Sequence, residues 1–194
     1  MKQKPLKVGF DMDGVLLYNP ARIARPLISL VKRKLRIIDR DELEFFVPKP
    51  GFQQVTWDFV HKSSCFIAPG FDEIVKLKEE GLIEPYLITA RFAHLEKDFN
   101  RWMKKMKADS VFVEYMMNYQ DEQPHLFKEK MIKKLELDFF VEDNLDIVGH
   151  LNQACLKTKI YWITNLLDNR YEYPNKFLSL KASIEEIKKA VINL

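Results

Sequence analysis

Short apolar runs bounded by polar residues recur along the chain, and each predicts a buried β-strand. The expected strands cover residues 6–10, 85–89, 110–115, 138–142 and 159–164. Apolar runs of this kind are typical of strands that are covered on both faces. The pattern therefore indicates a central sheet enclosed by other elements.

Between these runs, apolar residues recur with the spacing of an α-helix. The expected helices cover residues 71–80, 95–106, 128–135, 144–154 and 184–194. Gly81 stands where a helix C-cap is expected, and Ser183 with Glu186 has the spacing of a capping box before the last helix. Strands that alternate with helices predict an α/β fold. We expect a Rossmann-like three-layer α/β/α sandwich with a mostly parallel central sheet.

One long segment interrupts this alternation. Residues 20–35 have helical spacing with an apolar and a basic side, and residues 52–61 form a second helical stretch. A connection of this length is seldom plain loop in a compact domain. We expect residues 18–64 to form a small helical cap after the first strand, and residues 1–17 and 65–194 to form the core. Trp57 in the cap is a candidate for contact with a substrate.

Composition narrows the class of protein. The 194 residues are 47% hydrophobic and 30% charged, which fits one soluble domain with a sizeable core. No apolar run approaches the roughly 20 residues of a membrane helix, so no membrane partner is expected. The net charge of +3 suits small anionic substrates and makes nucleic acid an unlikely partner. The cysteines, Cys65 and Cys155, form no metal or disulfide pattern and fit a reducing cytoplasm.

Candidate chemistry begins directly after the first expected strand, at Asp11-Met12-Asp13-Gly14-Val15. Two carboxylates so close together repel each other unless a positive charge lies nearby. Mg²⁺, which prefers oxygen ligands, would supply that charge. Gly14 permits a tight turn that brings backbone N–H groups toward a phosphate. By itself, such a sequence is more often an ordinary acidic turn.

Two further expected strands end in residues of the same chemical kind. One ends in Thr89-Ala90-Arg91, where a hydroxyl can donate to a phosphate oxygen, and another ends in Glu142-Asp143. Taken alone, the threonine is more often a helix N-cap and the acids a solvated strand end. Together with Asp11 and Asp13, they predict a magnesium and phosphate site at the carboxyl edge of the sheet.

In this order of motifs the sequence resembles the haloacid dehalogenase (HAD) superfamily of aspartate-nucleophile phosphatases. Residues 11–15 resemble its first motif, residues 87–91 its second, and residues 141–144 its fourth. The third motif is a lysine. Lys128 has the usual position before the fourth-motif strand, and Lys130 remains an alternative, since the two would point to different helix faces. The Thr-Ala-Arg ending resembles the 5′-nucleotidase-like and 5′(3′)-deoxyribonucleotidase-like branch.

The resemblance implies a role for each of these residues. Asp11 would be the nucleophile that forms an aspartyl-phosphate, and Asp13 the general acid and then the general base. Mg²⁺ would be bound by Asp11, the backbone carbonyl of Asp13, and Asp143. The expected phosphate-binding residues are Thr89, Ala90, Arg91 and Lys128. The roles of Glu142 and Asp146 stay open.

These roles predict a Mg²⁺-dependent phosphohydrolase that acts on a small phosphomonoester, with a nucleotide as the first candidate. Sugar phosphates and the ends of nucleic acids are alternative substrates. A second alternative is a HAD-fold binding module without catalysis, which ranks last because both Asp11 and Asp13 are present. The sequence does not determine the substrate or the oligomeric state, because specificity in such folds lies in inserts and loops.

Overall fold

The structure is a computed structural model that describes residues 4–18, 43–45, 51, 54, 62–164 and 170–192. The two helical stretches expected in the cap, residues 20–35 and 52–61, lie outside the described residues apart from Gln54. Trp57 lies outside them too. The helical cap therefore stays a prediction.

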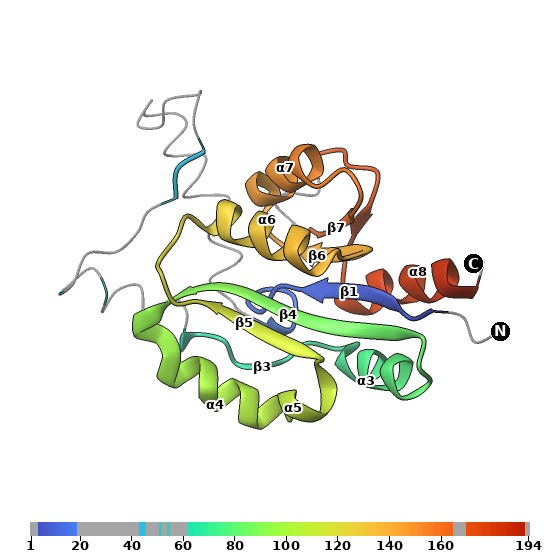
Figure 1. Cartoon of the computed structure of the whole chain (residues 1–194), viewed down its shortest axis with the longest axis horizontal. Helices are drawn as coiled ribbons and strands as arrows, with labels where there is room; N and C mark the ends of the chain where they lie inside the picture. Colours follow the sequence, from blue (N-terminus) through green and yellow to red (C-terminus); the bar gives the residue numbers. More distant parts are fainter. Residues whose placement is uncertain are drawn as a thin grey trace.

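The centre of the molecule is a six-stranded sheet in the order β5-β4-β1-β6-β7-β8. Its strands are β1 (Leu6–Phe10), β4 (Ile83–Phe92), β5 (Glu114–Asn118), β6 (Phe139–Glu142), β7 (Lys159–Ile163) and β8 (Lys176–Phe177). All neighbouring strands pair in parallel, so their carboxyl ends meet at one edge (Figure 1). β1 lies between β4 and β6, where the strand order reverses. Such a switch point is where open α/β sheets bind ligands.

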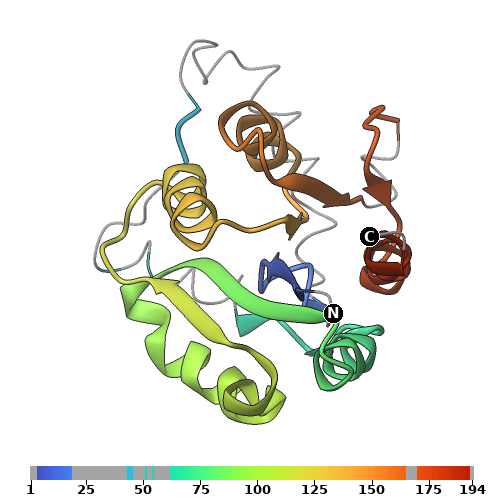
Figure 2. The ribbon, with the colours of Figure 1, turned by 45° about the vertical axis from the view of Figure 1, so that its right-hand side comes forward.

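Helices cover both faces of this sheet. They are α3 (Phe71–Glu79), α4 (Glu96–Met106), α5 (Ala108–Val111), α6 (Pro124–Leu135), α7 (Leu145–Ala154) and α8 (Leu180–Ile192), with a 3₁₀ turn, η1 (Ala93–Leu95). α6 and α7 lie on one face and α3, α4, α5 and α8 on the other (Figures 1 and 2). The expected three-layer α/β/α fold is confirmed. None of the helices that the structure describes is long and apolar enough to cross a membrane.

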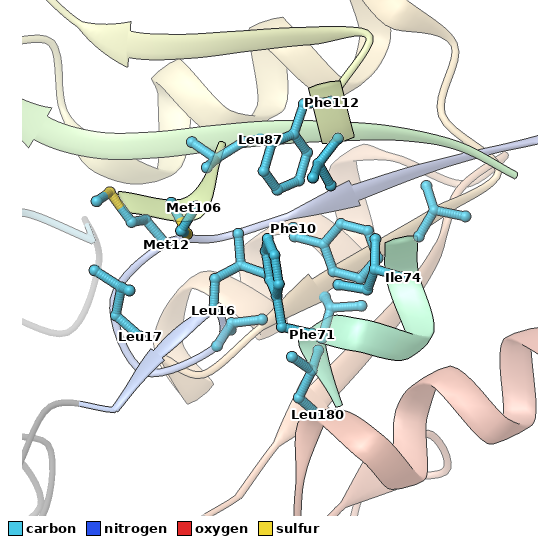
Figure 3. Packing of buried hydrophobic residues seen from close by; sticks show 14 of the residues in the cluster. Phe10, Met12, Leu16, Leu17, Phe71, Ile74, Leu87, Met106, Phe112 and Leu180 are labelled. Carbon is cyan, nitrogen blue, oxygen red and sulfur yellow. The ribbon is translucent and has the colours of Figure 1, made fainter. Parts of the chain in front are cut away.

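Alternation along the strands divides the core into two clusters. Phe10 and Val141 belong to the larger cluster, which packs under α3, α4, α5 and α8 (Figure 3). Phe140 points to the opposite face and packs with α6 and α7. Because successive side chains of a strand point to opposite faces, Asp11 and Glu142 fall on the α6 side. Strand periodicity alone thus directs two of the candidate site residues toward one helix.

A small antiparallel pair lies beside the carboxyl edge of the sheet. It consists of β2 (Leu17–Tyr18) and β3 (Phe66–Ile67), and the rings of Tyr18 and Phe66 stack with their centroids 4.7 Å apart. The chain therefore leaves the described core at Tyr18 and re-enters it at Phe66, directly beside Tyr18 and close to the loop that follows β1.

The expected strand at residues 110–115 is wrong. Lys107 has a positive φ of 52° that ends α4, and the chain forms the short helix α5 before β5 begins at Glu114. The apolar residues Val111 and Phe112 are buried as part of the connection, and Phe112 packs edge-on against Phe71. Tertiary packing therefore accounts for an apolar run that resembles a strand.

The expected start of the last helix is wrong as well, whereas Gly81 is confirmed at the end of α3. α8 begins at Leu180, which is buried, and the hydroxyl of Ser183 donates to the Leu180 carbonyl inside the helix (2.7 Å). Ser179 fulfils the capping role, since its hydroxyl accepts from the N–H of Ala182 (3.2 Å). Gly81 has a φ of +71° directly after the C-cap of α3.

Candidate active site

The candidate site residues come from the carboxyl ends of three neighbouring strands. Asp11 and Asp13 follow β1, Thr89 and Arg91 lie in the last four residues of β4, and Glu142 ends β6 with Asp143 directly after it. Each of these residues is at most 5% exposed. Burial of so many charged groups is costly unless they are paired or bind an ion. Their partners form two networks, one on each side of the Asp11–Asp13 segment.

The first network, called here the lysine network, consists of Asp11, Lys128 and Glu142. The Lys128 ammonium, from the sheet-facing side of α6, lies 2.9 Å from Asp11 Oδ1 and 2.6 Å from Glu142 Oε2. Lys130, two residues further on, is 56% exposed and pairs with Glu122 at 3.0 Å. The structure therefore brings Lys128 to the site and places Lys130 at the surface.

Glu142 also fixes the turn between β6 and α7. Its Oε1 accepts hydrogen bonds from the N–H groups of Asp143 (3.1 Å) and Asn144 (3.0 Å). Asn144 caps α7 by accepting from the N–H of Asp146 (3.0 Å), and the Trp162 indole donates to the Asp143 carbonyl (3.2 Å). Because both Glu142 oxygens have partners in the protein, Glu142 holds Lys128 and the Asp143 backbone in place.

Electrostatics in the lysine network favour an additional cation. Burial raises the pKa of Asp11 well above its usual range; the Lys128 ammonium opposes this rise, while neighbouring carboxylates add to it. Burial also raises the pKa of Glu142. Burial lowers the pKa of Lys128, but Asp11 and Glu142 outweigh that effect, so its pKa is raised and it stays protonated.

The second network, called here the arginine network, consists of Asp13, Arg91 and Asp98. Arg91 donates two hydrogen bonds to Asp13, from Nε to Oδ2 at 2.7 Å and from Nη2 to Oδ1 at 2.8 Å. Its Nη1 donates to Asp98 Oδ2 at 2.6 Å. Two further groups bind these carboxylates: Ser64 donates to Asp13 Oδ1 (3.0 Å), and Arg101 donates to Asp98 Oδ1 (2.5 Å).

Local structure explains how Arg91 reaches Asp13. The register between β4 and β5 shifts between Thr89 and Phe92, so Ala90 and Arg91 lie in an irregular strand end. The Arg91 N–H donates to the Thr89 hydroxyl (3.3 Å), and that hydroxyl still carries a proton to donate. Irregularities of this kind re-aim side chains next to functional sites.

The loop after β1 forms the tight turn that the sequence predicts. Gly14 has a φ of 84°, and the Met12 carbonyl accepts from the N–H groups of Leu16 (3.1 Å) and Leu17 (2.8 Å). The Gly14 N–H, however, donates to the Leu17 carbonyl (2.8 Å). This N–H group therefore belongs to the turn itself, and the approach of other backbone N–H groups of the turn to a phosphate stays a prediction.

Sequence reasoning missed Ser64 and Asp98. Asp98 had a detectable signal, because it lies on the apolar stripe of α4 together with Leu95 and Trp102 and is only 6% exposed. A carboxylate on the buried face of a helix indicates a buried cation nearby. Ser64 had no comparable signal, since it is a serine at the end of a long segment.

The oxygen donors fit Mg²⁺. Among the described residues, the carboxylates of Asp11, Glu142 and Asp143 form a group whose ligand atoms lie within 4.8 Å of one another. When ionised, these three carboxylates carry more negative charge than the ammonium of Lys128, which pairs with Asp11 and Glu142, can neutralise. A divalent cation would neutralise that excess, and an all-carboxylate site suits a hard cation.

Comparison with known proteins supports the fold. No family model matches the sequence, and no curated protein matches it either. Among solved structures, the chain is similar to a protein provisionally described as a β-phosphoglucomutase from Thermotoga maritima, with a TM-score of 0.59, 15% identity, and coverage of 95% of this chain and 99% of that chain. It is also similar to a family IA HAD hydrolase from Entamoeba histolytica, with a TM-score of 0.58, 12% identity, and coverage of 97% and 100%.

A third similar structure is that of CbbY from Rhodobacter sphaeroides in complex with phosphate, with a TM-score of 0.55, 13% identity, and coverage of 92% of this chain and 98% of that chain. At such identities the likeness establishes a shared fold. The described part of the chain shares the fold of these solved structures, among them the HAD hydrolase from Entamoeba histolytica.

Proposed function

We propose that the protein is a Mg²⁺-dependent phosphohydrolase that uses Asp11 as a covalent nucleophile on a small phosphomonoester. The observation that carries the proposal is the environment of Asp11. Its carboxylate lies 2.9 Å from the Lys128 ammonium, within a buried group of oxygen donors at a switch point of the sheet. Nucleophile, cation and metal donors are thus collected where α/β folds bind ligands.

The reaction would proceed in two displacements. An Asp11 oxygen forms a bond to phosphorus while the bond to the leaving oxygen breaks, and Asp13 gives that oxygen its proton. Water then attacks the aspartyl-phosphate, Asp13 takes the proton of that water, and the bond between Asp11 and phosphorus breaks. Lys128 and the Thr89 hydroxyl would stabilise charge on the transferred phosphoryl group.

Asp11, the Asp13 carbonyl and Asp143 would hold Mg²⁺, which supplies positive charge that screens an anionic nucleophile from an anionic substrate. Glu142 would support this arrangement by orienting Lys128, since both of its oxygens are already hydrogen-bonded. Because Asp13 would bind the metal through its backbone carbonyl, its side chain is left for proton transfer.

For the substrate we propose a nucleotide, on the resemblance of Thr89-Ala90-Arg91 to nucleotidase-like sequences. A sugar phosphate is the second candidate. The CbbY protein of similar fold is described in complex with xylulose-1,5-bisphosphate, at 13% identity and a TM-score of 0.54. A screen over nucleotides, sugar phosphates and phospho-amino acids separates these classes.

The central test is hydrolysis of 4-nitrophenyl phosphate with Mg²⁺ and after exhaustive chelation. We expect activity that needs the metal and returns when Mg²⁺ is added back. Beryllium fluoride should inhibit the wild type by occupying the phosphoryl position on Asp11, and it should not bind Asp11→Asn.

Lys130→Gln provides a matched control for Lys128, because Lys130 belongs to the same helix and lies at the surface. Full activity in EDTA would contradict the metal requirement. Full activity of Asp11→Asn would remove Asp11 from its role as nucleophile.

A further inference from the structure

We infer that Arg91 positions Asp13 for proton transfer and is itself held by Asp98, so that it acts through Asp13 and does not bind the transferred phosphoryl group. The inference rests on the proposed function, because it assigns a role within that same site. It also departs from the expectation, made from the sequence, that Arg91 binds phosphate.

The guanidinium of Arg91 is occupied by carboxylates. Two nitrogens contact the two oxygens of Asp13 at 2.7 and 2.8 Å, and a third contacts Asp98 at 2.6 Å. The Arg91 side chain has no exposed surface. These contacts use three of the five N–H donors of Arg91, and a phosphate that took one of them would leave a buried carboxylate with a weaker cation partner in the protein interior.

Charge is balanced around Asp13. With both carboxylates ionised, Asp13 and Asp98 are matched by Arg91 and Arg101, and these four groups together carry no net charge. This is the state in which Asp13 can take a proton from water in the second displacement. Asp13 and Asp98 outweigh the effect of burial on Arg91 and raise its pKa, which keeps the guanidinium charged. Both carboxylates of the arginine network therefore have a guanidinium partner among the described residues.

Arg91 also restrains the orientation of the Asp13 side chain. A general acid or base must lie within hydrogen-bond reach of the proton that it transfers. The side chain of an aspartate in a loop can adopt several rotamers. The two parallel contacts from Arg91, with the Ser64 hydroxyl on Oδ1, restrain both oxygens of Asp13 in one orientation. Lysine cannot reproduce such a fork, because its ammonium is a single point of contact.

Asp98 sets the position of Arg91 in turn. It is 6% exposed on α4, and its second oxygen binds Arg101, whose side chain is 62% exposed. Contacts therefore run from a surface arginine through Asp98 and Arg91 to Asp13. Asp98 touches neither the substrate nor the metal donors in this arrangement, and a change there tests positioning without altering the reacting groups.

The test compares Arg91→Lys, Arg91→Gln and Asp98→Asn with the wild type, and Lys104→Gln on the exposed side of α4 is the control. Two substrates are used, 4-nitrophenyl phosphate and an alkyl phosphate such as glycerol phosphate. The alkyl leaving oxygen needs a proton from Asp13, whereas nitrophenolate leaves without one. Each variant is assayed for kcat/KM on both substrates and for competitive inhibition by inorganic phosphate.

We expect Arg91→Lys to lose about 100-fold in kcat/KM on the alkyl ester, the loss typical of a misplacement of about 1 Å. The loss on 4-nitrophenyl phosphate should be about tenfold smaller, because acid catalysis contributes roughly 100-fold or more only where a proton is needed. The inhibition constant of phosphate should change by less than about threefold. Asp98→Asn should show the same pattern more weakly, and Lys104→Gln should equal the wild type.

An inhibition constant for phosphate that rises in parallel with the loss of kcat/KM would overturn the inference, since Arg91 would then bind the phosphoryl group. Equal losses on both esters would overturn it as well. If the Arg91 variants do not fold, Asp98→Asn and Ser64→Ala carry the same comparison. Failure of the proposed function is distinct, because it would appear in the wild type as absent or metal-independent activity.

Discussion

The lysine network and the arginine network are built alike but have different consequences. Each places one buried cation between two carboxylates, next to a residue of the Asp11–Asp13 segment. Lys128 makes one contact with each carboxylate, so most lone pairs of the Asp11 carboxylate are left for other ligands. Arg91 makes three contacts and uses both oxygens of Asp13. The lysine network is therefore open to ligands, and the arginine network is closed.

This difference follows from the chemistry of the two cations. An ammonium is a compact point charge, and a guanidinium is a planar fork that matches a carboxylate. Asp143 adds a further carboxylate beside the lysine network, and a divalent cation would neutralise this excess, whereas Arg101 adds a second positive charge beside the arginine network. The lysine network, which is open and negatively charged, suits a nucleophile. The arginine network, which is fixed and neutralised, suits a residue that must keep its orientation.

The largest effect is expected where the nucleophile itself is changed. Asp11→Asn should lower the turnover of 4-nitrophenyl phosphate by at least about 10³-fold, because no neighbouring group can replace a positioned nucleophile. Steady-state kinetics with saturating Mg²⁺ measures this loss. Without divalent cations the stability should hold or rise, since one of several clustered carboxylates is removed.

Asp13→Asn is the matched comparison for stability. It removes a carboxylate from a network that is already balanced, so we expect it to destabilise the metal-free protein where Asp11→Asn does not. Urea unfolding of both variants decides the point. Equal destabilisation would show that the open and closed networks do not differ in charge balance.

Removal of the cation from the open network should have the next largest effect. Lys128→Met leaves Asp11 and Glu142 buried without their ammonium, and we expect a loss of about 3–5 kcal/mol in the free energy of unfolding without metal. Mg²⁺ should restore part of it by binding only the folded form. Lys130→Gln, at the surface, should stay within about 0.5 kcal/mol of the wild type. Indistinguishable stability of the two variants would contradict the assigned pairing.

A smaller effect is expected at the edge of the closed network. Ser64→Ala removes one hydrogen bond to Asp13 and leaves the two contacts from Arg91, so we expect a cost of about 1 kcal/mol in stability. Ser64→Thr keeps the hydroxyl and should retain the wild-type stability. Chemical denaturation measures both. A loss as large as that of Lys128→Met would mean that Arg91 alone does not hold Asp13.

The smallest effect concerns a buried titratable group on the helix that carries Lys128. His125 is 6% exposed, and burial lowers its pKa; the neighbouring His150 adds to this, while Glu129 opposes it. A pKa lowered by folding contributes stability that is present above the unfolded pKa of about 6.5 and is lost as the pH falls below it. We expect His125→Phe to lose less stability than the wild type between pH 7.5 and pH 5.5. Parallel unfolding curves over that range would count against the buried, neutral histidine.

Much of the fold could be predicted from the sequence because its signals are local. Apolar runs located four of the five expected strands, and strand periodicity directs Asp11 and Glu142 to the same face as α6. The prediction of a strand at residues 110–115 was wrong because a buried connection can be as apolar as a strand. The last helix begins at Leu180, four residues before the predicted start. Burial of Leu180 in the core outweighed a plausible cap at Ser183.

Within the candidate site, the sequence by itself determined which residues end the strands, since covalent adjacency places Asp11, Thr89 and Glu142 at strand ends. Only the tertiary structure decided what each of them contacts. Lys128 reaches Asp11 and Lys130 does not, because the phase of α6 against the sheet is set by packing. Arg91 meets Asp13 across 78 residues, and Ser64 meets it across 51. Contacts over such separations are set by how whole elements pack, and no local pattern in the chain encodes them.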